Sequence, residues 1–315
     1  MRILIGSNGG LTGVYLSKQY RKLSKDLNED VFLVGTDASF SNTGKFFVDK
    51  QLVLPPASKK EFIPELIDIL NKEEIDIYIP THSKEIKIVS KNEDIIKNNT
   101  NSKFIVSPFC TFEALDDKRV ANSNLKKEGF PVPKLIEDYT CNYPILMKDD
   151  IGSGGSSNIR IDCFDVHQAY KKSRSSCSFY ELLRGEEYTV DCMFDSSGSL
   201  IAFNQRERLK TIGGAVSISK NSNKIDIEPW LHKFEEKWIF KGCVNFQFIY
   251  ADGKPYFIDI NLRYPSGGLP LSVESGLAVP SLILDLLSNK NRKKESKINC
   301  YKELSMYRYF EEIFE

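Results

Sequence analysis

Between Val244 and Gly268, apolar and polar positions alternate in two runs that flank an Asp-Gly turn. A period of two is typical of β-strands, and Asp-Gly between two such runs predicts a β-hairpin. Alternation also predicts which side chains share a face of the sheet. We expect one face to carry Gln247 from the first strand and Phe257, Asp259, Asn261 and Arg263 from the second.

An acidic residue, two amides and an arginine on one sheet face are unusual components for a hydrophobic core. Carboxylate and amide oxygens suit Mg²⁺, which binds one or two carboxylates together with substrate phosphates. An arginine beside them can present a fork of donors to a phosphate oxygen. For any one of these residues a solvated hairpin face is the alternative, but the complete set favours a metal and phosphate site.

The first 110 residues alternate between short apolar runs and amphipathic segments. Residues 2–5 and 31–35 predict buried strands, separated by the turn Gly6–Gly10 and a helix from Thr12 to about Leu23. This order is that of a βαβ unit in a parallel sheet. The same region should add a helix over 62–70, a strand over 75–80, a helix bearing Ile86, Val89, Ile95 and Ile96, and a strand over 104–106.

Ligands of such a sheet bind beyond the carboxyl ends of its strands, which here carry Asn8, Asp37, Thr81, His82 and Glu85. Each residue alone is more typical of a turn or a helix cap than of a ligand site. The glycines of the first turn resemble a dinucleotide fingerprint only loosely, and tight packing of helix on strand explains them about as well. An NAD-dependent dehydrogenase is therefore a weak alternative.

Beyond residue 110 the pattern changes. Thr111 should cap a helix that runs to Leu115, and a second helix should follow residues 116–118 and end at Gly129. A strand over 144–148 ends in Lys148 and precedes a segment of glycine and serine, after which residues 159–161 return as a strand. An exposed loop is one interpretation of this segment. A flexible flap whose backbone amides cover phosphates is the other, and the adjacent lysine favours it.

The remaining chain predicts an α+β region. A helix is expected over 164–173, two strands within 179–191, a strand over 199–207 and a closing helix over 277–287. Another helix over 229–240 should direct Trp230, Phe234 and Trp238 into the core. Residues 289–297 form a charged segment, for which we expect a loop.

Composition narrows the function classes. The 315 residues carry 43 basic and 43 acidic side chains, so no net charge favours a nucleic acid or a membrane surface as partner. Seven scattered cysteines without CxxC spacing argue against disulfides and zinc and favour a reducing compartment. The N-terminus is typical of a strand rather than of a signal peptide. We therefore expect a cytoplasmic protein.

The order of these parts resembles the ATP-grasp superfamily, in particular the carboxylate–amine ligases with a carbamoyl-phosphate-synthase-like ATP-binding domain. The resemblance extends over nearly the whole chain and rests on several motifs in the same order. It implies an α/β fold with a Rossmann-like pre-ATP-grasp domain over 1–110. A two-subdomain ATP-grasp α+β fold would follow, with a lid subdomain over 111–177 and a C-terminal subdomain over 178–315.

The resemblance also implies roles for individual residues. Lys118 and Lys148 would bind the phosphates of ATP, and the loop formed by Gly152, Ser153, Gly154, Gly155 and Ser156 would close on the triphosphate. The hinge that contacts adenine would consist of Glu181, Leu182 and Leu183. Glu187 would be the carboxylate that binds the ribose. The metal ligands would be Gln247, Asp259 and Asn261, the catalytic residues Lys148 and Arg263, and the substrate-facing residues Arg206, Arg208, Gly268 and His82.

The activity implied by the resemblance is ATP-dependent ligation of a small-molecule carboxylate to an amine, or to a thiol, through an acyl phosphate. ATP and Mg²⁺ would be the cofactors, with Mn²⁺ as an alternative metal, and a homodimer is a candidate assembly. Related families often have glutamate where Asp259 stands, and the shorter aspartate would bridge two metal ions less readily. A non-catalytic ATP-binding regulatory module is the alternative function.

Overall fold

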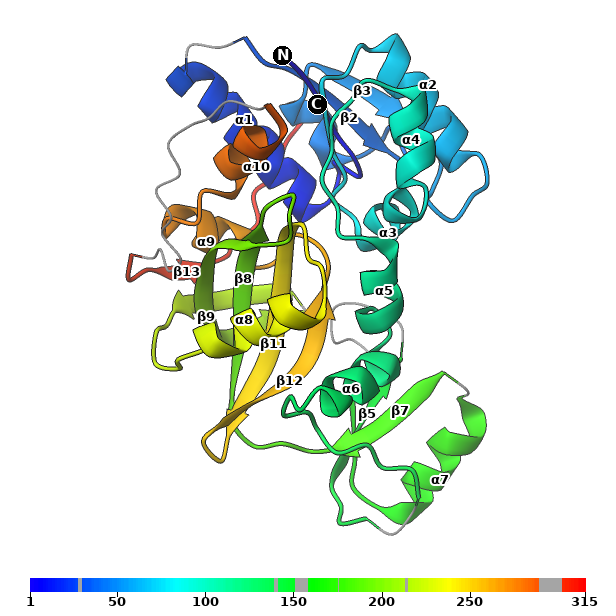
Figure 1. Ribbon diagram of the computed structural model, residues 1–315, viewed down its shortest axis with the longest axis vertical. Helices are drawn as coiled ribbons and strands as arrows, with labels where there is room; N and C mark the ends of the chain where they lie inside the picture. Colours follow the sequence, from blue (N-terminus) through cyan, green and yellow to red (C-terminus); the bar gives the residue numbers. More distant parts are fainter. Residues whose placement is uncertain (28–29, 139–140, 151–157, 175, 213–214, 289–301) are drawn as a thin grey trace.

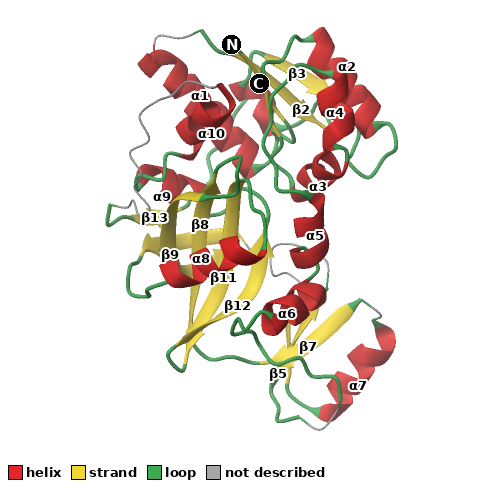
Figure 2. Ribbon diagram, viewed as in Figure 1, coloured by secondary structure: helices red, strands yellow, loops and turns green. Residues whose placement is uncertain are grey.

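The computed structural model of the protein describes residues 1–315 except 28–29, 139–140, 151–157, 175, 213–214 and 289–301. The described residues form a mixed α/β fold with one parallel and two antiparallel sheets (Figure 1; Figure 2). Among the described helices, none combines the length and apolar character that a membrane-spanning segment requires.

The N-terminal region is built on a parallel sheet with the order β3-β2-β1-β4. Ile3 pairs with Leu33 on one side and with Ile77 on the other, which confirms the expected βαβ unit. The strands are β1 (Arg2–Ile5), β2 (Phe32–Asp37), β3 (Lys50–Val53) and β4 (Ile77–Ile79). The helices are α1 (Leu11–Leu27), the 3-10 helix η1 (Thr43–Phe47), α2 (Phe62–Lys72), α3 (Ser83–Lys91) and α4 (Glu93–Asn99).

Two expectations for this region were wrong. The single helix expected beyond residue 85 is divided at Asn92, whose side-chain amide donates to the carbonyl of Ile88 and ends α3. The expected strand over 104–106 does not form, and an isolated bridge between Ile77 and Lys103 is the only pairing described there. Phe104 and Val106 are nevertheless buried. Their apolar pattern therefore reflects burial against the core rather than pairing in the sheet.

A small antiparallel sheet follows, with the order β6-β5-β7. Thr111 lies inside the first helix rather than capping it, because its hydroxyl donates to the carbonyl of Ile239 while Pro108 occupies the N-cap position. Asp117 caps the second helix through the amides of Arg119 and Val120. The elements are α5 (Phe109–Leu115), α6 (Lys118–Lys127), β5 (Ile145–Asp149), β6 (Ile159–Ile161), α7 (Phe164–Ser173) and β7 (Cys177–Glu181). The small sheet thus extends beyond residue 177.

The large antiparallel sheet has the order β12-β11-β8-β9-β10-β13. Its strands are β8 (Glu186–Phe194), β9 (Leu200–Ile212), β10 (Ala215–Asn221), β11 (Gly242–Ala251), β12 (Lys254–Asn261) and β13 (Ser305–Tyr307). The accompanying helices are α8 (Glu228–Lys237), α9 (Leu269–Glu274) and α10 (Val279–Ser288). The hairpin β11–β12 is confirmed, whereas β10, β13 and α9 were not expected.

One prediction for this hairpin was wrong. Gln247 pairs with Asp259 and Phe248 pairs with Phe257, so Ile258 has no opposite residue and forms a bulge. The extra residue shifts the alternation, because each inserted position turns the following side chains to the other face. Phe257 therefore joins the hydrophobic core, while Asp259 stays on the opposite face of the sheet.

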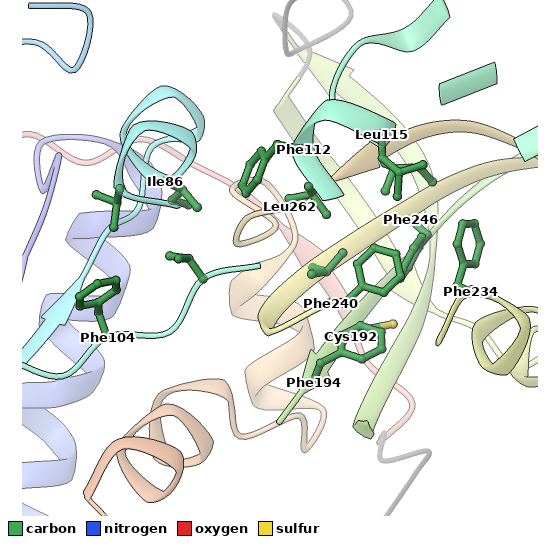
Figure 3. Close-up of a cluster of buried hydrophobic side chains, with 14 of the residues drawn as sticks. Ile86, Phe104, Phe112, Leu115, Cys192, Phe194, Phe234, Phe240, Phe246 and Leu262 are labelled. Atoms are coloured by element: carbon green, nitrogen blue, oxygen red, sulfur yellow. The ribbon is translucent and has the colours of Figure 1, made fainter. Parts of the chain in front are cut away.

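Two hydrophobic clusters join the N-terminal region to the large sheet. The first extends from Ile86 and Phe104 through α5, which contributes Phe112 and Leu115, to the aromatic side chains of the large sheet (Figure 3). The second packs α1 against α10 and the other side of the large sheet. The small sheet has a separate cluster that contains Ile145, Met147, Ile161 and Phe179. Its position is therefore not fixed by the main core.

The aromatic side of the large sheet provides a test of this packing. Phe234 of α8 is fully buried, with its ring centroid 4.3 Å from that of Phe130 and 4.5 Å from that of Phe246. We expect Phe234→Ala to lower the free energy of unfolding by about 3–5 kcal/mol, because it leaves a cavity among rings that cannot collapse into it. Urea denaturation measures this change. Phe164→Ala at a 44% exposed position is the control, and equal losses in both variants would contradict the assignment.

Candidate active site

The large sheet has one aromatic and one polar face. Opposite the core, adjacent strands place polar side chains in register: Gln247 lies between Asp259 and Thr189, and Asn245 lies between Asn261 and Asp191. The same face continues along β8 and β9 and includes Glu187, Asn204, Arg206 and Arg208. Strand alternation, corrected for the bulge, thus gathers the predicted polar residues on one surface.

Two lysines and an aspartate from three different elements line one cavity. Lys118 begins α6, Lys148 lies near the end of β5, and Asp259 comes from β12. Asn122 of α6 and Tyr180 of β7 complete its polar lining. The cavity has a volume of about 20 Å³, which is room for about one water molecule. A ligand larger than a water molecule therefore does not fit inside this cavity alone.

The environment of Lys148 disfavours the charged form of its ammonium group. Only 7% of Lys148 is exposed, and this burial lowers its pKa. The carboxylates of Asp259 and Glu187 counteract part of the effect, whereas the neighbouring positive charge of Lys118 adds to it. Two cations beside a limited negative charge create a site that a bound polyanion would stabilise.

A chain of hydrogen bonds links the polar side chains at the end of β12. Arg263 donates from Nη2 to Oδ1 of Asn261 over 2.9 Å, and Asn261 donates from Nδ2 to Oδ2 of Asp259 over 3.0 Å. Burial lowers the pKa of Arg263, and the carboxylates of Asp259 and Asp116 oppose this shift. The chain orients Asp259 and holds a guanidinium near the cavity.

A second group surrounds Gln247. Its Oε1 accepts a hydrogen bond of 2.7 Å from Nη1 of Arg208. The same nitrogen lies 2.8 Å from a carboxylate oxygen of Glu187. Since the charge of Glu187 also acts on Lys148, these contacts place Arg208 and Glu187 beside the lysine cavity.

Arg206 occupies a different environment from Arg208. It is 3% exposed and donates to both carboxylate oxygens of Asp191, at 2.9 and 3.2 Å. Ser272 of α9 also donates to Asp191. Gly268 packs directly on the arginine, since a Cβ atom there would lie 2.0 Å from Cζ of Arg206. Arg206 is thus embedded between the sheet and α9, and Gly268 permits the close contact.

His82 comes from the N-terminal region but lies near β12. It is the N-cap of α3, where its Nδ1 accepts a hydrogen bond from the amide of Lys84. Burial lowers the pKa of His82, and the positive charges of Lys84 and Arg263 lower it further. The charge of Arg263, which follows β12, therefore acts at the N-terminus of α3.

The predicted adenine hinge lies at the edge of the cavity. Glu181 is bound to the loop between α6 and β5. Its Oε1 accepts from the amide of Lys134, and its own amide donates to the carbonyl of Lys134. Leu182 and Leu183 are half-buried. These three residues do not line the small cavity, although the preceding Tyr180 does. The predicted phosphate loop, Gly152 to Ser156, lies outside the described residues.

Sequence reasoning missed three residues of this site. Asp116 lies within the electrostatic range of Arg263 and forms a 2.6 Å ion pair with Lys87. Asn122 donates to the carbonyl of Pro133 while it lines the cavity. Tyr180 contributes the third side chain. In the sequence, Asp116 and Asn122 lie close to Lys118, and Tyr180 directly precedes the expected hinge. This closeness does not distinguish a site residue from a helix cap or a core residue.

The described residues contain no group of three or more His, Cys, Asp or Glu side chains that could hold a metal by themselves. Asp259 provides one carboxylate, while Oε1 of Gln247 and Oδ1 of Asn261 accept from arginines. One carboxylate accompanied by phosphate oxygens is a donor set that Mg²⁺ accepts. The residues therefore fit a metal that arrives with a nucleotide rather than a resident ion.

Comparisons with known proteins give a consistent result. A family model described as ATP-grasp in the biosynthetic pathway with Ter operon matches residues 178–308. The carbamoyl phosphate synthase large chain of Clostridium beijerinckii is 24% identical over 335 residues, covering 96% of this chain and 30% of that protein. The chain thus spans about 30% of the length of this curated relative.

Solved structures share the fold at low identity. The biotin carboxylase domain dimer of Hydrogenobacter thermophilus 2-oxoglutarate carboxylase, in complex with MgADP, ADP and bicarbonate, has a TM-score of 0.74 at 13% identity, covering 95% of this chain and 72% of that one. N5-carboxyaminoimidazole synthetase of Staphylococcus aureus, in complex with ADP, has a TM-score of 0.67 at 14% identity, covering 98% of this chain and 93% of that one. Residues 178–308 thus match an ATP-grasp family model, and the chain shares its fold with these two solved structures.

Lys148 provides a test in which stability and ligand binding should separate. We expect Lys148→Met to leave the free energy of unfolding unchanged or to raise it, because methionine removes the cost of burying a charge. The same variant should lose measurable binding of Mg-ATP in titration calorimetry. A strongly destabilised variant, or one that binds Mg-ATP normally, would contradict this role of the lysine.

The two arginines of β9 should respond differently to substitution. Arg206→Met leaves the buried carboxylate of Asp191 uncompensated, so we expect a loss of about 3–5 kcal/mol in the free energy of unfolding. Arg208→Met should cost less than about 1 kcal/mol, because Glu187 retains access to water. Urea denaturation of both variants measures the difference. Equal losses would show that Arg206 is not the structural member of the pair.

Proposed function

We propose that the protein is an ATP-dependent ligase that activates a carboxylate through an acyl phosphate and transfers it to an amine, or to a thiol. The observation that carries this proposal is the convergence of Lys118, Lys148 and Asp259 on one cavity from three separate elements. Two cations and one carboxylate match the requirements of a triphosphate that arrives with a divalent metal.

In this proposal each part of the fold has a role. The N-terminal region, about 1–110, is the Rossmann-like pre-ATP-grasp domain, and the small sheet with α7 is the lid. The separate hydrophobic cluster of the lid is consistent with its movement relative to the large sheet. ATP would enter between the small sheet and β12, with adenine beside Glu181, Leu182 and Leu183.

The polar face then contacts the remainder of the nucleotide. Lys118 and Lys148 would bind phosphate oxygens, joined by the amides of residues 152–156. Glu187 would accept hydrogen bonds from the ribose if it exchanges its contact with Arg208. Asp259, with Gln247 and Asn261, would hold Mg²⁺ or Mn²⁺, which supplies positive charge to the triphosphate. One carboxylate in this set favours a single metal ion over two.

The chemical step needs no nucleophilic side chain from the protein. A carboxylate oxygen of the substrate attacks the γ-phosphorus, the bond to the β-phosphate oxygen breaks, and ADP leaves with that electron pair. The amine then attacks the acyl carbon, the C–N bond forms, and phosphate departs while the nitrogen loses a proton to solvent. Arg263 and Lys148 would stabilise the negative charge of the transferred group, and the closed lid would exclude water.

Arg208 is the better candidate for the substrate side of the site than Arg206. It contacts Gln247 and Glu187 near the lysine cavity, whereas Arg206 is enclosed beneath α9. A homodimer and a cytoplasmic location also belong to the proposal. The first is supported by the dimer described for the Hydrogenobacter thermophilus domain, and the second by the scattered cysteines of the sequence.

A regulatory module that binds ATP without turnover is the second candidate. Incubation of the protein with Mg-ATP and a panel of carboxylate and amine pairs distinguishes the two functions. A ligase should form ADP and phosphate only when both substrates are present. Binding of Mg-ATP without ADP formation for any pair would favour the regulatory module.

Asp259→Asn is the matched variant for this experiment. It preserves the size of the side chain and removes the one carboxylate of the metal set, so we expect ADP formation to fall at least ~100-fold. The variant should also require more Mg²⁺ for nucleotide binding in titration calorimetry. An unchanged dependence on Mg²⁺ would show that Asp259 does not hold the metal.

A further inference from the structure

A second cavity lies at the carboxyl ends of the parallel strands in the N-terminal region. Its volume is about 360 Å³, which is within the range of small-molecule sites. The polar side of the cavity includes Asp37 at the end of β2 and His82, Lys84 and Glu85 at the start of α3. The opposite side consists of Leu54, Pro55, Pro56, Ala57 and Phe62.

The glycine-rich turn beside this cavity is not arranged to bind phosphate. The amide of Gly6 donates to Ile79, that of Asn8 to Thr36 and that of Gly10 to Ser7. The amide of Gly9 donates to Oδ2 of Asp37. Because these amides already have acceptors inside the protein, they are not available to a pyrophosphate. The cavity must select its ligand by its side chains.

Asp37 gives the cavity a fixed negative charge. Its carboxylate accepts from the amide of Gly9 at 3.1 Å and from that of Ser39 at 3.5 Å. An ionised carboxylate offers about four acceptor positions, so these bonds orient Asp37 and leave capacity for a further donor. A primary ammonium group has the charge and the three donors that such a carboxylate binds.

The opposite polar end of the cavity presents donors. Because Nδ1 of His82 accepts from the amide of Lys84, the neutral ring carries its proton on Nε2 and can donate from that atom. Lys84 is exposed beside it, and the charge of Arg263 acts on the same ring. The cavity thus has an acceptor at Asp37 and donors at His82 and Lys84. The carboxylate of Glu85 also lies at this end, where it accepts from the hydroxyl of Tyr78 and the amides of Thr81 and His82.

The apolar side completes the description of the ligand. Leu54 and Phe62 are buried members of the main core, and Ala57 packs against them. Pro55 and Pro56 stiffen the wall, because proline restricts the backbone. A ligand that fills this space would place an aliphatic or aromatic group against the prolines and keep its charged groups on the opposite side.

We propose that this cavity binds an apolar α-amino acid as the carboxylate substrate, with its ammonium group on Asp37, its side chain against residues 54–57 and its carboxylate directed past His82 towards Arg263. This inference rests on the proposed ligase function and specifies its substrate class. The amino group held by Asp37 is protonated and does not react. The carboxylate end is the one that receives the phosphoryl group.

Titration calorimetry of the full chain in the presence of Mg-ATP tests the proposal. The probes are L-alanine, L-valine, L-leucine, L-methionine and L-phenylalanine, with 4-methylpentanoate and 3-phenylpropanoate as analogues that lack the amino group. We expect at least one amino acid to bind at least about 10-fold more tightly than its deaminated analogue, which corresponds to one charge-assisted hydrogen bond. If no amino acid binds, or if the analogues bind equally well, the proposal is overturned.

Two variants locate the binding site. Asp37→Asn keeps an acceptor for Gly9 but removes the charge, so it should weaken the amino acid at least about 10-fold and leave Mg-ATP affinity unchanged. Ala57→Trp fills the apolar part of the cavity and should abolish amino acid binding by a separate route. Asp68→Asn, an exposed position on α2, is the matched control. Unaltered amino acid affinity in both cavity variants would overturn the assignment.

The outcomes separate this inference from the proposed function. If wild-type protein binds Mg-ATP and forms ADP with other carboxylates but binds no apolar amino acid, only the substrate assignment fails. If the wild type does not bind Mg-ATP at all, the proposed function fails and the substrate assignment fails with it. Circular dichroism and thermal unfolding of each variant confirm that a loss of binding does not reflect loss of the fold.

Discussion

The candidate site depends on a positive charge that is buried between two sheets. Lys148 belongs to the small sheet, and burial lowers its pKa, while Asp259 on the large sheet offsets part of the cost. The small sheet has a hydrophobic cluster of its own, so few apolar contacts fix its position against the large sheet. A bound polyanion would supply the missing negative charge. In the proposed function, the electrostatics of this lysine would couple nucleotide binding to the relative position of the two sheets.

The large sheet can serve this site because its two faces carry different side chains where the polar residues gather. One face packs into the aromatic cluster that contains Phe246 of β11 and Phe234 of α8. The other face carries the polar residues in register across β12, β11, β8 and β9. The bulge at Ile258 preserves this division within β12, since a regular strand would turn Phe257 and Asp259 to the same side. The bulge in β12 is thus required for the polar residues of the site to share one face.

The N-terminal region contributes to the same centre through the ends of its strands. The backbone amides of its glycine-rich turn donate to acceptors inside the protein, and the absence of a side chain at Gly9 allows Asp37 to approach. Side chains at the end of β2 and after β4, such as Asp37 and His82, line the second cavity. The positive charge of Arg263 lowers the pKa of His82. His82 lines the second cavity, and Asp259, which lines the lysine cavity, is joined to Arg263 through Asn261. Such an arrangement suits a reaction that joins a nucleotide to a second small molecule.

By itself, the sequence determined the features that arise from neighbouring residues. The βαβ unit, the hairpin around Asp252 and Gly253 and the helix end at Gly129 follow from short-range periodicity and turn chemistry. Only the tertiary structure decided that Thr111 bonds to Ile239, that Phe104 is buried without pairing, and that Arg206 rather than Arg208 is enclosed with Asp191. These outcomes depend on partners more than 12 residues away or on the competition of two similar residues for one partner, and local patterns contain no record of either.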